Sequence, residues 1–248
     1  MLIGRLAALG AALVLAGCVT GGEKVAFHTT NPQQQSMMRD GLPALVSRQK
    51  GSLVLVKPAT RQTQVGGRPV FTVGINNIGK VPIDFRVDQI QVGQIVNGQE
   101  YPMQVVTYEM LAQEEKNRQV AAAIFAGVAA GANAYGASRA GYGSYTTPSG
   151  RTGTFYSPTA AVIAQSNAAA QNDAMISATI ERGQANMAAL EQSVIKDNTL
   201  MPGEWYGGQL HLSPPVNPPS GNQKTYSIVI TVGTDRHVIE VAQTPLGA

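Results

Sequence analysis

An alanine- and glycine-rich stretch, residues 109–198, separates two runs of short β-type segments, and this arrangement most constrains the fold. Alanine has the highest helix propensity of the amino acids, so the stretch predicts helices. The segments on either side are rich in β-branched residues and alternate in polarity, which predicts strands. Three strands after so long an interruption would leave an apolar face uncovered, so we expect both runs to pair within one domain.

Eight segments carry the strand pattern, and turn residues separate them. Large apolar residues alternate through 226–232, and the dipeptide Asn97-Gly98 between two such segments is a strong signal for a tight turn. The segments are 53–56, 69–75, 81–85, 90–96, 100–108, 205–212, 226–232 and 238–242. This number of short strands favours a two-layer antiparallel β-sandwich formed by residues 51–108 together with 199–248.

The pattern from Phe71 through Phe85 resembles the early hairpin of immunoglobulin-like modules in bacterial envelope proteins. The cysteine pair of antibody domains is absent, because the chain has a single cysteine. The resemblance implies an immunoglobulin-like antiparallel β-sandwich. The predicted fold class is therefore mainly β with an α insertion, in which a long antiparallel α-helical hairpin interrupts the sandwich.

Residues 109–198 are predicted to form this helical hairpin. The first helix is expected from about Glu109 to Ser138, with acidic residues near its N-terminal end, where the helix dipole favours them. A tip rich in glycine, serine, threonine and tyrosine follows, and its composition predicts irregular structure. Ser157 is a good N-cap before Pro158, so the second helix is expected from there to about Asp197. Helices of about 45 and 60 Å, at 1.5 Å per residue, would project from the domain.

Each predicted helix carries a stripe of apolar or small residues at steps of three and four. Glycine and alanine in such stripes let two helices approach closely, so we expect these residues to pack the helices together or to mediate self-association. The predicted residues are Val120, Ile124, Gly127 and Gly131 on the first helix and Ile176, Ile180, Gly183 and Met187 on the second.

The uncharged segment between Arg118 and Arg139 has the length of a membrane span, since about 20 helical residues cross a bilayer core. Its strong apolar residues are only Val120, Ile124, Phe125 and Val128. At roughly −0.3 to −0.6 kcal/mol each, they are largely offset by polar residues and glycine. Three uses of the hairpin therefore stay open: packing on itself or its own domain, docking onto a partner or further copies, and entry into a membrane.

The first 17 residues predict a secretory signal peptide, with Arg5 before a short uncharged run that ends in small residues. The end of this segment together with the next residue, Leu15-Ala16-Gly17-Cys18, resembles the lipobox of bacterial lipoproteins. This resemblance implies that Cys18 is acylated, anchors the mature chain in a membrane and becomes its first residue. Val19 in place of an inner-membrane retention aspartate implies the outer membrane, facing the periplasm. Residues 18–50 are predicted to be the lipidated cysteine and a polar tether.

The sequence contains no pattern that indicates a catalytic site. His28, His211 and His237 are isolated from other ligand-type residues, so neither a metal nor another cofactor is predicted. The net charge of +3 is spread singly along the chain, which disfavours a nucleic-acid partner, and no small-molecule substrate is indicated. We expect a non-enzymatic outer-membrane lipoprotein whose hairpin binds an envelope protein or further copies of itself. The alternative is a subunit of an oligomeric envelope channel or secretion apparatus.

Overall fold

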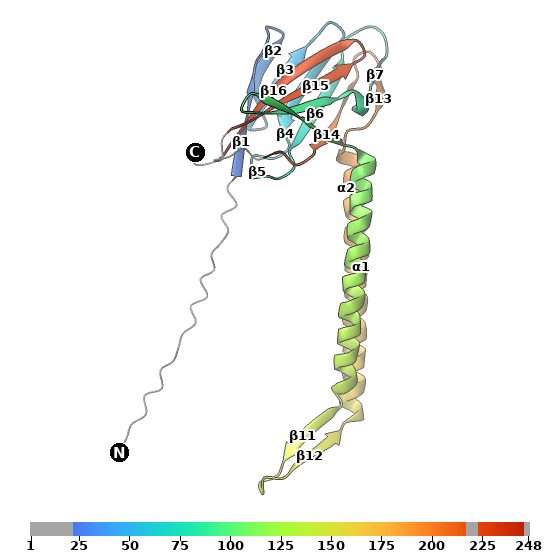
Figure 1. Ribbon diagram of the computed structural model, residues 1–248. Coiled ribbons are helices and arrows are strands. Elements are labelled where there is room, and N and C mark those ends of the chain that lie inside the picture. The colour runs from blue at the N-terminus through green and yellow to red at the C-terminus, as the bar shows by residue number, and fades with distance from the viewer. Residues whose placement is uncertain (1–21, 217–222, 246–248) are drawn as a thin grey trace, which may run out of the picture.

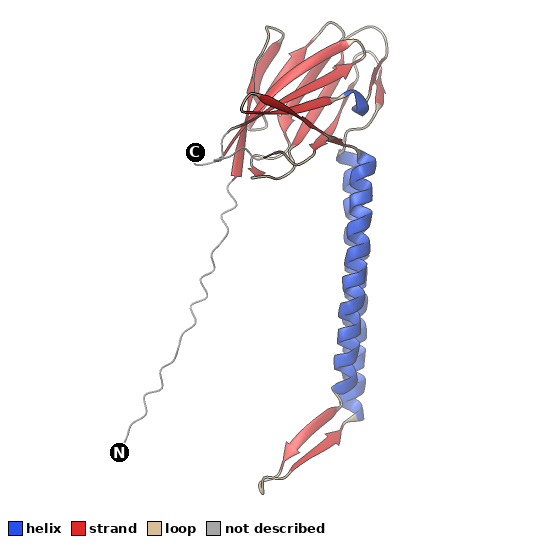
Figure 2. Ribbon diagram, in the orientation of Figure 1, coloured by secondary structure: helices blue, strands red, loops and turns tan. Residues whose placement is uncertain are grey.

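The computed structural model describes residues 22–216 and 223–245 (Figure 1). It is mainly β with two helices, as the sequence predicts. The strands gather in one body, the sheet domain, and the two helices extend from it to a small two-stranded sheet at their far end (Figure 2). We call the helices and this small sheet the arm. The predicted signal peptide and Cys18 lie outside the described residues.

The sheet domain contains two antiparallel sheets. The first has the order β13 (Asn198–Leu200), β7 (Ile83–Phe85), β15 (Lys224–Val232), β16 (Asp235–Pro245), β1 (Gly22–His28) and β5 (Thr63–Gln64), with β8 (Gln91–Val96) and β9 (Gln99–Met103) joined through β15. The second has the order β10 (Val105–Val106), β14 (Trp205–Leu212), β6 (Val70–Asn77), β4 (Ser52–Pro58), β3 (Leu42–Arg48) and β2 (Gln34–Arg39). A short 3-10 turn, Val87–Gln89, precedes β8.

Strands from before and after the helices pair in both sheets. In the second sheet β14 pairs with β6 from Trp205–Asn76 to His211–Val70. In the first, β15 pairs with β8 and β13 pairs with β7. Both sheets contribute to a single buried cluster, in which the alternate residues of β4, β6 and β15 are almost fully excluded from solvent. The two runs of strands therefore pair in both sheets and share one buried cluster.

The predicted tether over residues 18–50 is wrong where the structure describes it, because β1, β2 and β3 occupy most of 22–48. β1 pairs with β16 along its length, and β2 and β3 meet at a two-residue turn. Asp40 and Gly41 form this turn with φ of 54° and 72°, the left-handed values that such tight turns require. The sequence did not predict β1 and β2 because both contain many polar residues. Part of that polarity is internal, since Glu23 is buried and paired with Lys224.

The helices begin close to where the sequence predicts. α1 (Tyr108–Arg139, 32 residues) is capped by Thr107, and α2 (Pro158–Ser193, 36 residues) by Ser157. α2 ends before Asp197 because the chain there joins the sheet domain: the Ile195 amide donates to the carbonyl of Gln209. Gly208 makes this approach possible, since a Cβ there would lie 2.7 Å from the Ile195 nitrogen.

The tip of the arm is regular, contrary to the sequence prediction. β11 (Tyr142–Thr146) and β12 (Thr152–Tyr156) pair antiparallel and form the small third sheet. Glycine does not disrupt this pairing but makes room for it. The ring of Phe155 lies across Gly143 and the ring of Tyr145 lies across Gly153, where a Cβ would clash. Cross-strand contacts of aromatic side chains thus outweigh the turn-like composition.

Candidate interaction surface on the helical arm

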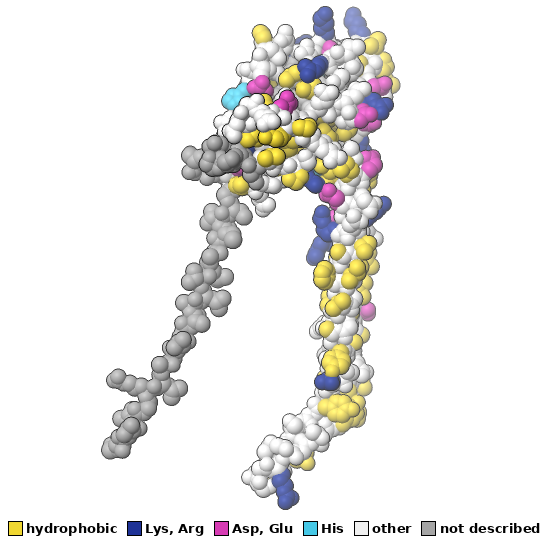
Figure 3. All heavy atoms as spheres, viewed as in Figure 1, with side chains coloured by type: hydrophobic (Ala, Val, Ile, Leu, Met, Phe, Trp, Pro, Cys, Tyr) yellow, Lys and Arg dark blue, Asp and Glu magenta, His cyan; other side chains and the backbone are white. Residues whose placement is uncertain are grey.

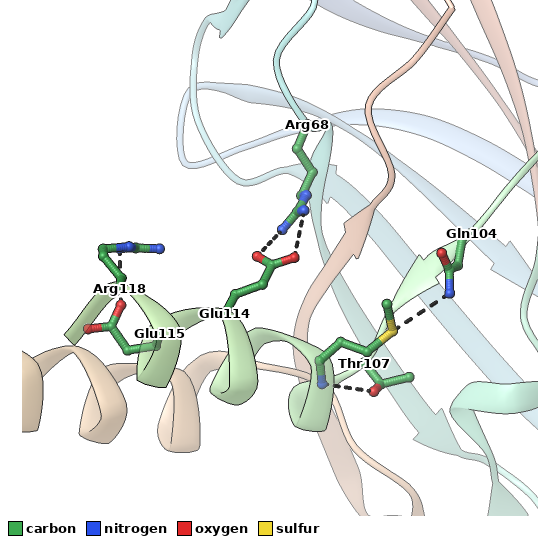
Figure 4. A network of polar contacts seen from close by, with 7 residues as sticks. Arg68, Gln104, Thr107, Glu114, Glu115 and Arg118 are labelled. Atoms are coloured by element: carbon green, nitrogen blue, oxygen red, sulfur yellow. Dashed lines mark hydrogen bonds and ion pairs between the residues drawn. The ribbon is translucent and has the colours of Figure 1, made fainter. Parts of the chain in front are cut away.

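The domain end of the arm is fixed by apolar and ionic contacts. Val106, Leu111 and Val194 form a buried cluster between β10, α1 and the end of α2. Beside it, the two terminal guanidinium nitrogens of Arg68, Nη1 and Nη2, donate to the carboxylate of Glu114 on α1, each at 3.0 Å (Figure 4). Hydrogen bonding to Arg68 lowers the pKa of Glu114. The arm therefore leaves the domain in a defined direction.

The surface along which α1 and α2 meet, the seam, is polar near the domain. Glu115 is 3% exposed, and its carboxylate accepts hydrogen bonds from Gln119 at 3.3 Å and from Asn186 at 3.1 Å. The Gln119 amide also donates to the carbonyl of Gly183 on α2 at 3.1 Å. A Cβ on Gly183 would lie 2.8 Å from the Gln119 side chain, so the absence of a side chain at Gly183 makes room for this contact.

Farther along the arm the seam is made of alanine and amide side chains. Asn133 of α1 donates to the side-chain oxygen of Asn172 of α2 at 2.9 Å, and Asn172 donates back to the carbonyl of Ala130 at 3.2 Å. Ala126 is buried on the domain side of these bonds, and Ala137 and Ala161 are buried between them and the tip. Small residues and satisfied polar groups thus hold the two helices together.

The large residues that the sequence placed between the helices face outward instead. Val120, Ile124, Ile176 and Ile180 are 61%, 63%, 42% and 54% exposed. A Cβ on Gly127 or Gly131 would meet no atom within 4 Å, and Met187 is half-buried. Of the predicted set, only Gly183 is buried in the seam. The half-buried Met187 stays a prediction. As contacts between α1 and α2, the four exposed residues and the two open glycines are wrong, because valine and isoleucine give a stronger hydrophobic signal than the alanines that fill the seam. Their part in self-association stays a prediction.

The outer surface of the arm therefore carries an unusual number of large apolar side chains (Figure 3). Among the described residues, α1 is the helix whose length and composition would allow it to cross a membrane. Residues 116–172 contain no Asp or Glu, whereas they include four basic residues. The exposed apolar side chains are Val120, Ile124, Phe125, Val128 and Tyr135 on α1, Tyr142, Tyr145, Phe155 and Tyr156 at the tip, and Val162, Ile163, Ile176 and Ile180 on α2.

The sheet domain contains a buried serine–histidine–aspartate network that the sequence did not reveal. His237 of β16 contacts Ser47 at Nδ1 and Ser52 at Nε2, at 3.0 and 2.9 Å, and Ser52 donates to Asp235 at 2.7 Å. Here Ser52 lies between His237 and Asp235, whereas in a catalytic triad histidine lies between the serine nucleophile and the aspartate. Ser47, Ser52 and His237 are 0% exposed, so no substrate reaches them. Burial lowers the pKa of His237 to about 4. The network joins the two sheets.

A second buried polar group lies at the start of the described chain. Glu23 of β1 accepts from Lys224 and from Gln243, each at 2.7 Å, and all three side chains are at most 2% exposed. In the described part of the chain, the Tyr226 hydroxyl is also buried, without a hydrogen-bond partner. These groups tie β1 to β15 and β16. Within residues 22–216 and 223–245, no three His, Cys, Asp or Glu side chains are grouped so as to hold a metal ion.

No protein-family model matches the chain, and no curated protein or solved structure matches it either. Function must therefore be inferred from the described residues. The feature that requires an explanation is the arm, whose seam consists of small and polar residues and whose outer surface exposes many large apolar side chains.

Proposed function

We propose that the chain is a non-enzymatic outer-membrane lipoprotein, acylated at Cys18 and facing the periplasm. In this proposal an immunoglobulin-like antiparallel β-sandwich presents an antiparallel helical hairpin to another envelope protein or to a second copy. The observation that carries the proposal is the inversion of the arm: Val120, Ile124 and Val128 face outward while Gln119 and Asn133 lie in or beside the seam.

The inversion has an energetic consequence. Burial of one large apolar side chain contributes about 1.5–3 kcal/mol, and the exposed residues of α1 alone forgo several such contributions. A helix pair that served only as a spacer would be expected to turn these side chains inward. Exposed apolar patches of this kind mark surfaces that bind another molecule. The arm is therefore the interaction element in this proposal, and the sheet domain is its support.

The sandwich and hairpin descriptions have direct structural support. The two sheets share one buried cluster, and their strands run antiparallel in both. The two helices lie side by side, hydrogen bonded near both ends, and the chain reverses between them through β11 and β12 (Figure 1).

The anchor is tested by labelling with radioactive or clickable palmitate in a bacterial host that processes lipoproteins. We expect label on the intact chain and none on the Cys18→Ser variant, with the variant retained as the larger precursor. Equal labelling of the two proteins would contradict the anchor assignment.

The interaction arm is tested by site-specific photo-crosslinking in intact envelopes. A benzophenone amino acid at Ile176 samples α2, and the control at Val65 samples a somewhat more exposed site on the sheet domain. We expect one defined adduct from Ile176, either with a second copy or with a single identified protein, and none from Val65. Adducts from neither position, together with a monomeric mass by light scattering, would refute protein contact by the arm.

The alternative function is a subunit of an oligomeric envelope channel or secretion apparatus whose hairpins associate and enter the membrane. Its support is that α1 has the length and composition of a membrane span, while the seam uses small and amide residues, as membrane helix pairs do. This alternative requires a discrete oligomer, and it requires residues 142–156 to be protected from protease in membranes. A monomer with a cleavable tip contradicts it.

A further inference from the structure

We infer that the outer surface of α1 and the tip of the arm bind a lipid bilayer with anionic headgroups, with α1 facing the acyl chains and α2 facing water. The inference rests on the proposed function in taking the arm as the contact element. It goes further by naming lipid as what α1 and the tip contact, and it leaves α2 and the sheet domain for proteins.

The apolar side chains of α1 lie opposite the seam. Val120, Ile124, Val128 and Tyr135 follow one another at steps of four and seven, so they form one stripe along the helix. At 100° per residue, this stripe points away from Gln119 and the buried alanines that face α2. All four side chains are about 60–70% exposed. The stripe is therefore available along the whole middle of the arm.

The outer surface of α2 is more polar than that of α1, because polar and charged side chains stand between its exposed Val162, Ile163, Ile176 and Ile180. This difference makes the arm amphipathic as a unit. Asn167, Asp173, Ser177 and Glu181 are exposed on α2. Charged side chains are strongly disfavoured in the centre of a bilayer, so Asp173 and Glu181 oppose a crossing of the whole arm. An arm with one apolar side and one polar side instead lies in the plane of the interface.

The charges on the α1 side match an anionic surface. The basic residues of the stretch from 116 to 172, which lacks acidic residues, stand at the two ends of the stripe: Lys116 and Arg118 near the domain, Arg139 and Arg151 near the tip. Arg118 is already paired with Glu115, at 3.0 Å. Basic residues next to an inserted apolar surface are attracted to anionic lipids.

The same charges disfavour a second copy as the occupant of this surface. Two α1 stripes brought together would bring Lys116, Arg139 and Arg151 of each chain into one interface, in addition to the paired Arg118. No acidic residue of that stretch is available to pair with them. Like charges without partners at an interface are repulsive, whereas an anionic bilayer neutralises them.

The tip has the composition of an interfacial anchor. Tyr142, Tyr145, Phe155 and Tyr156 are each more than half exposed, and the rings of Tyr142 and Tyr156 are 4.9 Å apart. Arg139 lies over the ring of Tyr135, at 4.6 Å from its centroid. Aromatic rings of amphipathic character are enriched at the headgroup level of membranes, and arginine reaches the phosphates from there.

The chain between Cys18 and β1 is too short to keep a bilayer far from the sheet domain. The Gly22 end of β1 and the arm leave the sheet domain in the same general direction (Figure 1). Cys18 precedes Gly22 by four residues, which span at most about 14 Å. An acylated Cys18 would therefore hold a bilayer within about 14 Å of the start of β1, close enough for the arm to contact it.

The test uses the chain from Val19 to Ala248, which contains every described residue and no acyl chain. Trp205, which is exposed on the sheet domain, is replaced by phenylalanine so that single tryptophans report on the arm. Val128→Trp reports on the α1 stripe, and Ala174→Trp, on the exposed outer side of α2, is its matched control. The probes are vesicles of phosphatidylethanolamine and phosphatidylglycerol (3:1) and vesicles of phosphatidylcholine.

On the anionic vesicles we expect a blue shift of the Val128→Trp emission and its quenching by brominated acyl chains, with neither effect for Ala174→Trp. The pair Ile124→Gln and Val128→Gln should weaken vesicle binding at least about 10-fold. The pair Arg139→Gln and Arg151→Gln should weaken binding to anionic vesicles about 10-fold and leave phosphatidylcholine binding nearly unchanged. These side chains are exposed, so unchanged thermal unfolding is expected and serves as the folding control.

Three outcomes would overturn the inference. Val128→Trp could show no change with either vesicle, both tryptophans could be quenched equally, or the blue shift could follow protein concentration in the absence of lipid. A missing vesicle response together with a defined Ile176 adduct would refute lipid binding and leave the proposed function standing. If both responses are missing, both proposals fail.

Discussion

The buried imidazole of His237 predicts a specific loss of stability in mild acid. Ser52 donates its hydroxyl proton to Asp235, so Ser52 must accept from Nε2–H of His237, and Nδ1 accepts from Ser47. This pattern satisfies the neutral ring. A proton on Nδ1 would remove the acceptor that Ser47 uses, inside a site that water does not reach. The folded protein therefore resists protonation of His237.

The size of the effect follows from the pKa. The pKa of His237 falls from its ordinary value of 6.5 to about 4, mainly because burial disfavours the charged ring. Between these values the unfolded chain binds a proton that the folded protein does not, so stability falls as the pH falls. The difference corresponds to about 2 kcal/mol at pH 5 and approaches roughly 3 kcal/mol below pH 4.

Urea unfolding of the wild type and of His237→Gln at pH 7, 6 and 5 would measure this contribution. We expect the wild type to lose about 2 kcal/mol more than the variant between pH 7 and pH 5. The lowered pKa of His211 acts in the same direction but is common to both proteins and cancels. His28→Gln, at an exposed site, should keep the wild-type pH dependence. Parallel curves for wild type and His237→Gln would refute the buried neutral imidazole.

Three further predictions concern the arm and the second buried network. Gly183→Val should destabilise the arm by about 1–3 kcal/mol, because the valine side chain would clash with Gln119. Gly131→Ala, at a position with open space around it, should stabilise α1 by up to about 1 kcal/mol. Hydrogen exchange of the arm amides should be faster in the first variant and slower in the second. Lys224→Met should cost about 3–5 kcal/mol in urea unfolding because Glu23 is left buried without its partner, and the added change Glu23→Leu should restore part of this. Replacement of residues 116–186 by a short Gly/Ser linker should leave one cooperative unfolding transition, since Leu111 and Val194 remain to close the base; loss of that transition would contradict a single sheet domain.

The sequence predicted the features that depend on strong local signals. Ser157 and Pro158 define the start of α2 through capping chemistry, and Asn97 and Gly98 adopt φ of 52° and 78° in the turn between β8 and β9. The alternating apolar pattern likewise predicted β15, whose Tyr226, Ile228, Ile230 and Val232 belong to the buried cluster. Each of these signals is contained within a few residues of chain and so does not require knowledge of the tertiary partners.

The features that escaped prediction depend on partners distant in sequence. Glu23 reads as a solvated residue until Lys224 and Gln243 are known to surround it. His237 reads as isolated because Ser47 and Ser52 come from another sheet. In the arm, periodicity identified an apolar stripe on each helix, but it cannot state which side faces the other helix. The side that faces the other helix carries alanine and asparagine, which contribute little to a hydrophobic pattern.

The two ends of the arm meet the sheet domain next to each other, through Val106 before α1 and Val194 after α2. The length of the arm can therefore change without changing the structure of the two sheets. Removal of seven residues from each helix, two turns each, would shorten its reach by about 10 Å without disturbing the base or the tip. Natural variation or engineering could thus set the distance between the domain and whatever the tip touches through paired insertions and deletions alone, as in a ruler.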